Sequence, residues 1–326
     1  MMGGLSTDRI GGGARLSRSV RARILRRGRM ATVALALLAG GCSARSTPSA
    51  PGVVNAVGAE NQYADILSQI GGRYVRSSAI LSNPNTDPHT FESSPAVAEE
   101  VSSAQLIVQN GLGYDGFMDK IESASPAADR RVIVVQQLLG LPDDSPDPHL
   151  WYDPRTMPVV ARAMAADLSV LQPQHASYFR ANLAAFDASL QPWERAIAAF
   201  RARHAGVAVA TTEPVADYLL RAMGMDNLTP FGFQADVMNG VDTSPQDVTL
   251  ENGLLSAHRV KVFCYNRQVV DGLTSSIRAT AERAGVPGVA VYETMPTPGF
   301  TYQTWMLAEV EAIQRAVDDG ASTERL

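Results

Sequence analysis

The chain has 326 residues, of which 45% are hydrophobic and 19% are charged. This length is enough for two domains of about 100–200 residues each, and the composition excludes an intrinsically disordered or fibrous protein. Residues 1–41 carry eight arginines and one aspartate, so the formal charge of −5 becomes −12 for the remainder. An acidic body argues against a nucleic-acid-binding surface. Cys42 and Cys264 are too few cysteines for a disulfide framework or a cysteine-rich zinc site.

The first 41 residues follow the order of a secretory signal peptide. An Arg-, Gly- and Ser-rich segment, 1–29, precedes a short apolar run, 31–39, and then Gly-Gly-Cys. The run is far shorter than the roughly 20 apolar residues of a membrane-spanning helix. Small residues that end in cysteine resemble a bacterial lipobox, in which the cysteine is lipidated and becomes the new N-terminus. We therefore expect lipidation at Cys42. Two or more acyl chains at this residue would anchor the protein stably to a membrane.

A Ser-, Ala- and Pro-rich tether over residues 42–52 leads into alternating strands and helices. Apolar and β-branched runs predict a first series of strands at 53–58, 74–81, 106–110 and 132–135, with helices at 60–70 and 94–103. A second series predicts strands at 207–211, 228–231, 260–265 and 286–291, with helices at 214–223, 268–284 and 303–317. Such alternation is typical of parallel sheets. We predict an α/β fold with two lobes, residues 53–153 and 205–326.

The segment between the predicted lobes, residues 154–204, shows no strand pattern. Over 174–203 its apolar residues recur at alternating spacings of four and three, as on one face of a long helix: Phe179, Leu183, Phe186, Leu190, Trp193, Ile197 and Phe200. Pro192 should bend this helix near Ala188, because the proline ring clashes with the carbonyl four residues back. We expect the stripe to pack against the two lobes, and a partner-binding coiled coil is the alternative.

Two of the five histidines follow the same tripeptide, Asp-Pro-His. His89 and His149 each lie in a predicted strand-to-helix loop, and the proline stiffens that loop and restricts the residue before it. Such preorganisation suits a metal ligand. A solvated or capping histidine is the alternative for either one alone, but the repetition favours a shared site built by the fold. His175, His204 and His258 lack this setting, and we expect exposed or helix-terminal roles for them.

Two glutamates follow predicted strands of the second lobe. Glu213 comes after the strand at 207–211, and Glu293 comes after the strand at 286–291. Ligands of open α/β sheets bind at the carboxyl ends of the strands. The alternative for each glutamate is a favourable charge near the start of the next helix. Together with the two histidines they form a set of two imidazoles and two carboxylates, which suits Zn²⁺ or Mn²⁺.

These features resemble the solute-binding lipoproteins of bacterial zinc and manganese ABC importers, the TroA-like and ZnuA-like periplasmic metal-binding family. The resemblance rests on the lipobox, the long central helix and three motifs: Asp-Pro-His-Thr-Phe-Glu at 87–92, Asn-Gly-Leu-Gly-Tyr-Asp at 110–115 and Asp-Pro-His-Leu-Trp at 147–151. It implies two α/β lobes with parallel sheets joined by one long rigid helix, and one metal ion in the cleft between the lobes. It also implies that His89 and His149 are ligands and that Glu213 is the third, as in the glutamate branch of the family.

The fourth ligand of this family is usually an aspartate near the last strand. Here the only acidic residue between positions 286 and 306 is Glu293, so we assign it as the fourth ligand. The alternatives are Asp236, Asp242 or a water molecule. Cys264 lies in a predicted apolar strand, where a buried thiol behaves as a small hydrophobic side chain, and we do not expect it to bind metal.

We therefore expect an exported protein, lipid-anchored to the outer face of the cell membrane, that captures Zn²⁺ or Mn²⁺ and delivers it to an ABC importer permease. We expect a monomer that is not an enzyme and binds no nucleic acid. The alternatives are an adhesin on the same scaffold and a secreted metallohydrolase. A hydrolase needs an open coordination position and a general base, but the sequence has neither a His-Glu-x-x-His helix nor a nucleophile elbow.

Overall fold

The structure is a computed structural model that describes residues 52–85 and 88–326. The predicted signal peptide, the lipidation site Cys42 and all but the last residue of the predicted tether lie outside these residues. Within the described part of the chain, no helix has both the length and the apolar character needed to cross a membrane.

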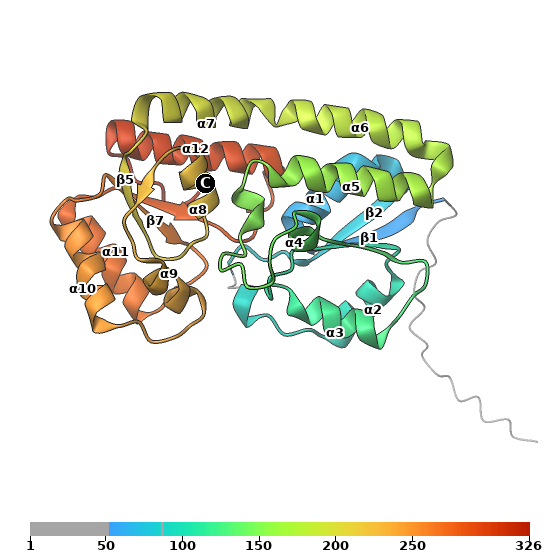
Figure 1. The fold of residues 1–326 in the computed structure, drawn as a ribbon, viewed down its shortest axis with the longest axis horizontal. Coiled ribbons are helices and arrows are strands. Elements are labelled where there is room, and N and C mark those ends of the chain that lie inside the picture. Colours follow the sequence, from blue (N-terminus) through green and yellow to red (C-terminus); the bar gives the residue numbers. More distant parts are fainter. Residues whose placement is uncertain (1–51, 86–87) are drawn as a thin grey trace, which may run out of the picture. The chain divides into compact units, whose positions relative to one another are not determined.

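The first sheet contains four parallel strands in the order β2-β1-β3-β4 (Figure 1). Its elements are β1 (Val54–Glu60), α1 (Asn61–Gly71), β2 (Val75–Leu81), α2 (Pro95–Ser103), β3 (Leu106–Gln109), α3 (Gly116–Ala124), β4 (Arg131–Val134) and α4 (Val135–Leu138). Successive side chains of a strand face opposite sides of the sheet. Leu106 and Val108 accordingly join the main core with α1, whereas Ile107 joins a second cluster with α2 and α3. Burial on both sides explains the continuous apolar strands of the sequence.

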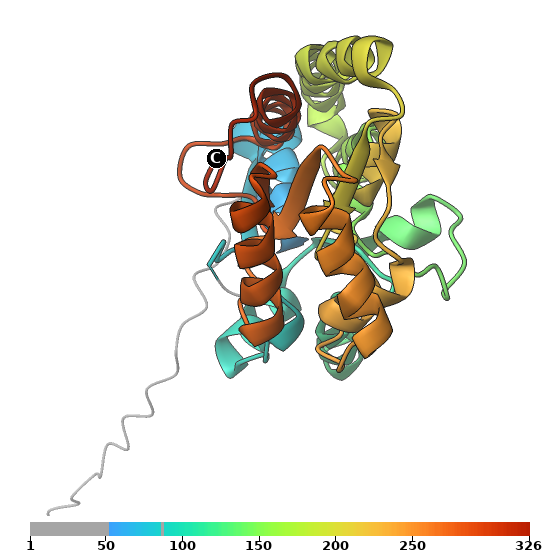
Figure 2. The same ribbon diagram turned by 90° about the vertical axis from the view of Figure 1, so that its left-hand side faces the viewer.

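The second sheet also contains four parallel strands, in the order β6-β5-β7-β8. Its elements are β5 (Ala208–Thr211), α8 (Asp217–Ala222), β6 (Asp226–Asn227), α9 (Phe231–Met238), α10 (Pro245–Ser256), β7 (Val262–Asn266), α11 (Gly272–Ala284), β8 (Gly288–Val291) and α12 (Tyr302–Asp319). Helices α10 and α11 pack side by side (Figure 2). The two parallel sheets confirm the predicted two-lobed α/β fold.

The strand predicted at 228–231 is wrong. The observed strand β6 is an edge strand of two residues, Asp226–Asn227. The Leu228 N–H still bonds to the Val209 carbonyl, but Pro230 has no N–H to donate and Phe231 begins α9. The helix predicted at 268–284 is shorter than expected, because Asp271 caps it and it begins at Gly272. Gln268 is therefore a loop residue.

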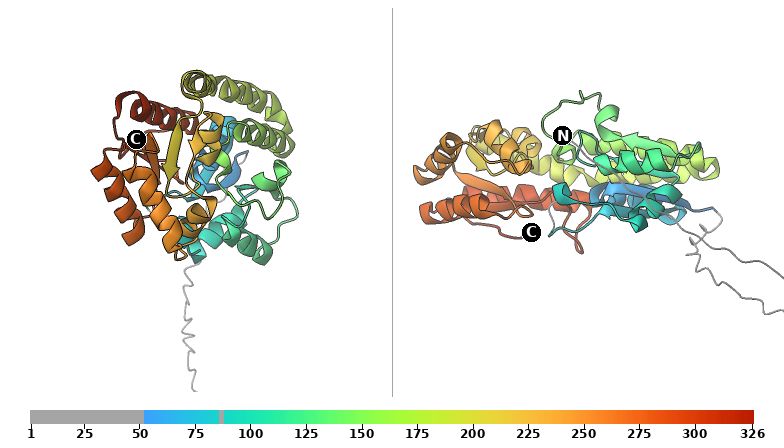
Figure 3. Two further views of the ribbon diagram at one scale, coloured as in Figure 1. Left: turned by 60° about the vertical axis from the view of Figure 1, so that its left-hand side comes forward. Right: turned by 90° about the horizontal axis from the view of Figure 1, so that it is seen from below.

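Three helices connect the two sheets: α5 (Thr156–Leu171), α6 (Ala176–Ser189) and α7 (Gln191–His204). Helices α6 and α7 follow each other with only Leu190 between them, so the predicted long helix is present and bent. The break lies at Leu190 rather than Ala188, and Pro192 occupies the first turn of α7, where proline is tolerated. Helix α6 packs on α1 and α7 packs on α12 (Figures 1 and 3).

The predicted apolar stripe faces the interior of the chain. Phe179, Phe186, Leu190, Trp193, Ile197 and Phe200 are buried in the main core, and Leu183 packs against it. Intramolecular packing therefore uses this stripe, as we expected. Of the remaining histidines, His204 ends α7 and pairs with Asp318 at 3.0 Å.

Candidate metal centre

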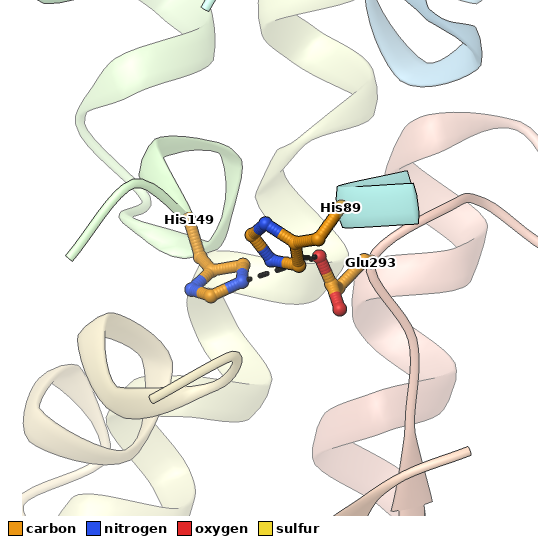
Figure 4. Close-up of side chains that lie close together, drawn as sticks. All are labelled: His89, His149 and Glu293. Carbon is orange, nitrogen blue, oxygen red and sulfur yellow. Dashed lines mark ion pairs between the residues drawn. The ribbon is translucent and has the colours of Figure 1, made fainter. Parts of the chain in front are cut away.

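Three side chains from distant parts of the sequence converge at one point: His89, His149 and Glu293 (Figure 4). One potential ligand atom of each lies within 4.8 Å of the others. The Glu293 Oε2 atom is 3.2 Å from His89 Nε2 and 3.5 Å from His149 Nε2. Donors bound tetrahedrally to zinc at about 2.0–2.1 Å lie about 3.3 Å from one another. The observed spacing therefore suits three ligands of a single ion.

A carboxylate orients the His149 ring. His149 precedes the short 3₁₀ helix η3 (Leu150–Tyr152) and is fully buried. Asp147 Oδ1 accepts hydrogen bonds from the His149 backbone N–H at 3.0 Å and from its Nδ1 at 2.8 Å. This contact makes Nδ1 the protonated nitrogen and directs Nε2 toward Glu293, as in the carboxylate–histidine pairs of metal sites. The aspartate and the histidine of this Asp-Pro-His tripeptide are thus hydrogen-bonded to each other, and this bond orients the histidine ring.

His89 is the most accessible of the three. It lies in the 3₁₀ helix η2 (Pro88–Thr90), and its side chain is 23% exposed, whereas those of His149 and Glu293 are fully buried. It forms part of the wall of a cavity of about 500 Å³, together with Gly240 and Gln268. An ion from solution can therefore reach the site from the His89 side.

Glu293 lies just after β8, at the carboxyl end of the second sheet, as predicted. Its Oε1 atom accepts a hydrogen bond from Asn266 Nδ2 at 2.6 Å, and its Oε2 atom accepts one from the Tyr114 hydroxyl at 2.9 Å. Gln268 Oε1 accepts the backbone N–H groups of Glu293 and Thr294 at 2.7 and 2.9 Å. Both the carboxylate and its backbone are thus held in place.

Residues from the first half of the chain also hold the Glu293 loop. The Asn61 side-chain amide donates to the Met295 carbonyl at 2.8 Å and accepts the Met295 N–H at 2.9 Å. Gln62 donates to the Glu293 carbonyl at 3.4 Å, and the Tyr152 hydroxyl donates to the Tyr292 carbonyl at 2.8 Å. The loop that carries Glu293 is therefore bonded to α1 and η3 as well as to its own sheet.

His149 and Glu293 each shift the pKa of the other. Burial lowers the pKa of His149, but the hydrogen bonds and charges of Asp147 and Glu293 outweigh it and raise that pKa from 6.5 to about 10. Burial raises the pKa of Glu293, but the hydrogen bonds and charges of His149 and His89 lower it well below its usual value. Without metal, the site therefore contains an imidazolium–carboxylate ion pair. An incoming cation must displace the imidazolium proton.

Glu213, also expected as a ligand, lies outside this group of three. It follows β5 and is 2% exposed, and its Oε2 atom accepts a hydrogen bond from Asn266 Nδ2 at 3.2 Å. The same Asn266 amide thus links Glu213 to Glu293. The alternative ligands Asp236 and Asp242 are also outside the group: Asp236 lies in α9, and Asp242 is exposed.

Tyr114 and Asn266 are parts of the site that we did not predict from the sequence. Tyr114 belongs to the Asn-Gly-Leu-Gly-Tyr-Asp motif, which was used only as a mark of resemblance. Asn266 ends the buried strand β7, and a polar residue at the carboxyl end of a parallel strand is a signal that could have identified it. Cys264 is buried in β7, as expected, and burial raises the pKa of its thiol well above the usual value.

The chain is similar to known metal-binding proteins. The manganese-binding lipoprotein MntA of Bacillus subtilis is 26% identical over 282 residues, which cover 82% of this chain and 88% of that protein. The high-affinity zinc uptake system protein ZnuA of Haemophilus ducreyi is 22% identical over 247 residues, covering 65% of this chain and 77% of that protein.

Solved structures share the fold. The periplasmic zinc-binding protein TroA of Treponema pallidum has a TM-score of 0.66 at 19% identity, covering 83% of this chain and all of that one. The solute-binding protein FpvC of Pseudomonas aeruginosa, solved with Mn²⁺, has a TM-score of 0.67 at 19% identity, covering 82% of this chain and all of that one. The family described as ZnuA, zinc-uptake complex component A, periplasmic, matches residues 57–316. This chain therefore belongs to the ZnuA family.

Proposed function

We propose that this protein captures Zn²⁺ or Mn²⁺ outside the cytoplasm and delivers the ion to the permease of an ABC importer. The observation that carries the proposal is the convergence of His89, His149 and Glu293 within 4.8 Å, two of them buried. Imidazole nitrogens and carboxylate oxygens are the donors that zinc and manganese take from proteins. We propose that Glu213 completes the set as the fourth ligand.

The names of relatives support this function. Besides manganese-binding and zinc uptake proteins, they include the metal ABC transporter substrate-binding lipoprotein SloC of Streptococcus mutans. These names describe metal-binding proteins, and that of SloC describes the substrate-binding component of a metal ABC transporter. We extend to this chain the role of a non-enzymatic, monomeric binding component whose partner is the permease.

The ligand chemistry explains how such a site takes up and neutralises an ion. Two carboxylates, Glu213 and Glu293, compensate the double positive charge, so an occupied site is nearly neutral and tolerates burial. The cation replaces the proton of His149, and the Asp147 carboxylate then holds the neutral imidazole in its ligating orientation. Zinc binds more tightly than manganese to almost any such donor set, so geometry and metal supply must determine which ion is carried.

We further propose that lipidation at Cys42 anchors the protein to the outer face of the membrane. The supports are the run of small residues before Cys42 and the lipoprotein names of MntA and SloC. The anchor keeps the loaded protein close to its permease, which raises the effective concentration of the two partners.

Titration calorimetry with Zn²⁺ and Mn²⁺ tests the ligand set. We expect Glu293→Gln and Glu213→Gln to lose similar amounts of affinity, because each keeps its volume and loses its charge. The matched controls, Asp236→Asn and Asp242→Asn, should bind as the wild type does. A protein with both histidines replaced by alanine should not bind. Wild-type binding by that double variant would refute the proposed site.

A further inference from the structure

One neutral side chain lies between the two carboxylates of the proposed metal site. Asn266 is the last residue of β7 and is 3% exposed. Its Nδ2 atom donates one hydrogen bond to Glu213 Oε2 at 3.2 Å and another to Glu293 Oε1 at 2.6 Å. Both hydrogens of this amide are therefore used on the two glutamates.

The orientation of this amide is determined by its other contacts. Asn266 Oδ1 accepts the backbone N–H of Gln268 at 2.9 Å, and the Asn266 backbone N–H donates to Thr212 Oγ1 at 3.0 Å. A flipped amide would place Oδ1 against two carboxylates and Nδ2 against a backbone donor. The NH₂ group therefore points toward the glutamates.

This arrangement limits how each glutamate can bind an ion. A carboxylate can bind a metal through one oxygen or through both. Glu293 Oε1 accepts a hydrogen bond from Asn266, and Oε2, which accepts one from the Tyr114 hydroxyl, is the atom that lies close to both imidazoles. Glu213 Oε2 accepts a hydrogen bond from the same Asn266 amide. Each hydrogen bond takes up one of the two lone-pair directions of its oxygen, so the Asn266 amide competes with an ion for Glu293 Oε1 and Glu213 Oε2.

The resulting donor number matters for the choice of metal. Two imidazoles and two single carboxylate oxygens make four donors, the number that zinc takes in closed tetrahedral sites. Manganese favours octahedral, oxygen-rich surroundings and gains from carboxylates that bind through both oxygens. A side chain that competes with the ion for the second oxygen of each glutamate therefore disfavours manganese more than zinc.

We propose that Asn266 is a specificity-determining residue that disfavours a second metal–oxygen bond from each glutamate and so favours a four-coordinate ion. This inference rests on the proposed function and adds to it a metal preference. Asn266 acts through Glu213 and Glu293 rather than by contact with the ion, so its test needs measurements that a structural role alone would not change.

Two such measurements are the ratio of zinc to manganese affinity and the visible spectrum of the Co²⁺-substituted protein. Four-coordinate Co²⁺ absorbs strongly and six-coordinate Co²⁺ weakly. We expect strong absorption from the wild type. In Asn266→Ala, which removes the amide and makes room for both oxygens, we expect weak absorption and at least a tenfold lower preference for zinc.

A second variant keeps the test independent of packing. Asn266→Leu keeps the branched shape of the side chain but has neither a donor for the glutamates nor an oxygen that could bind the ion, so it should shift both measurements in the same direction. The control is Asn252→Ala in α10, whose amide bonds to Thr280 and Val248; it should change neither measurement.

Each outcome has a separate meaning. Weak cobalt absorption by the wild type, or unchanged spectra and affinity ratios in the folded Asn266 variants, would overturn this role for Asn266 and leave the proposed function intact. A wild-type protein that binds neither zinc nor manganese would instead overturn the proposed function.

Discussion

Metal binding should release a proton from His149. Its pKa of about 10 means that the metal-free imidazole is protonated at pH 8. A metal ligand must be neutral, so binding at this pH has to displace about one proton from this ring. Glu293 is ionised both before and after binding, because its pKa is lowered. Between pH 7 and pH 9 the displaced proton should raise the apparent zinc affinity about tenfold per pH unit, or about 1.4 kcal/mol.

Calorimetry in two buffers of equal pH but different ionisation enthalpy counts the released protons directly. The zinc titration at pH 8 should show close to one proton from His149, and the His258→Asn control should release the same number because His258 lies outside the site. An affinity that does not change between pH 7 and pH 9, with no proton released, would refute the imidazolium–carboxylate pair as the resting state.

The remaining predictions concern stability, orientation and anchoring. The pKa of His149 is higher in the folded protein than its unfolded value of about 6.5, so protonation of this ring stabilises the metal-free fold. This stabilisation is complete below a pH of about 6.5 and is lost as the pH rises toward 10. Thermal melts of chelator-treated protein should therefore show Tm falling over that range. Asp147→Asn should weaken zinc binding about 10–100-fold in a competition titration, whereas Asp167→Asn, which affects an ion pair with an arginine on β4, should not. Phe186→Ala should lower the free energy of unfolding in urea by about 3–5 kcal/mol, and an unchanged midpoint would contradict the burial of the α6 stripe. Cys42→Ser should move the protein from the membrane fraction to the soluble fraction, and retention in the membrane would exclude the lipid anchor.

The local pattern of apolar and polar residues was enough to predict most of the fold. Strands such as β1 and β7 are buried on both faces, so each is a continuous apolar run with recognisable ends. Strand β6 could not be predicted in this way, because two polar residues, Asp226 and Asn227, form it only by pairing with β5 at the sheet edge. The apolar residues that follow belong to α9, where packing of the second lobe determines the structure.

Some residues of the candidate site could be predicted from the sequence, and others could not. His89 and His149 could be identified from a repeated tripeptide, and Glu293 from its place after a strand. Asn266 and Tyr114 are neutral residues that lie 27 and 179 positions from Glu293, so only the fold gives them a role. The ligand role of Glu213 and the limits of the predicted domains stay predictions.

The attachment of the Glu293 loop to the first half of the chain affects how an ion can leave. Asn61, Gln62, Tyr114 and Tyr152 form six hydrogen bonds with residues 292–295. Each is worth about 0.5–1.5 kcal/mol, so pulling this loop away from α1 would cost several kcal/mol. Glu293 is also bonded to Asn266 and Gln268 of the second lobe, so a movement of either sheet alone has to break hydrogen bonds on one side of the site. We expect an ion to leave on the side of His89, which is more exposed than His149 and Glu293, while both sets of hydrogen bonds are kept.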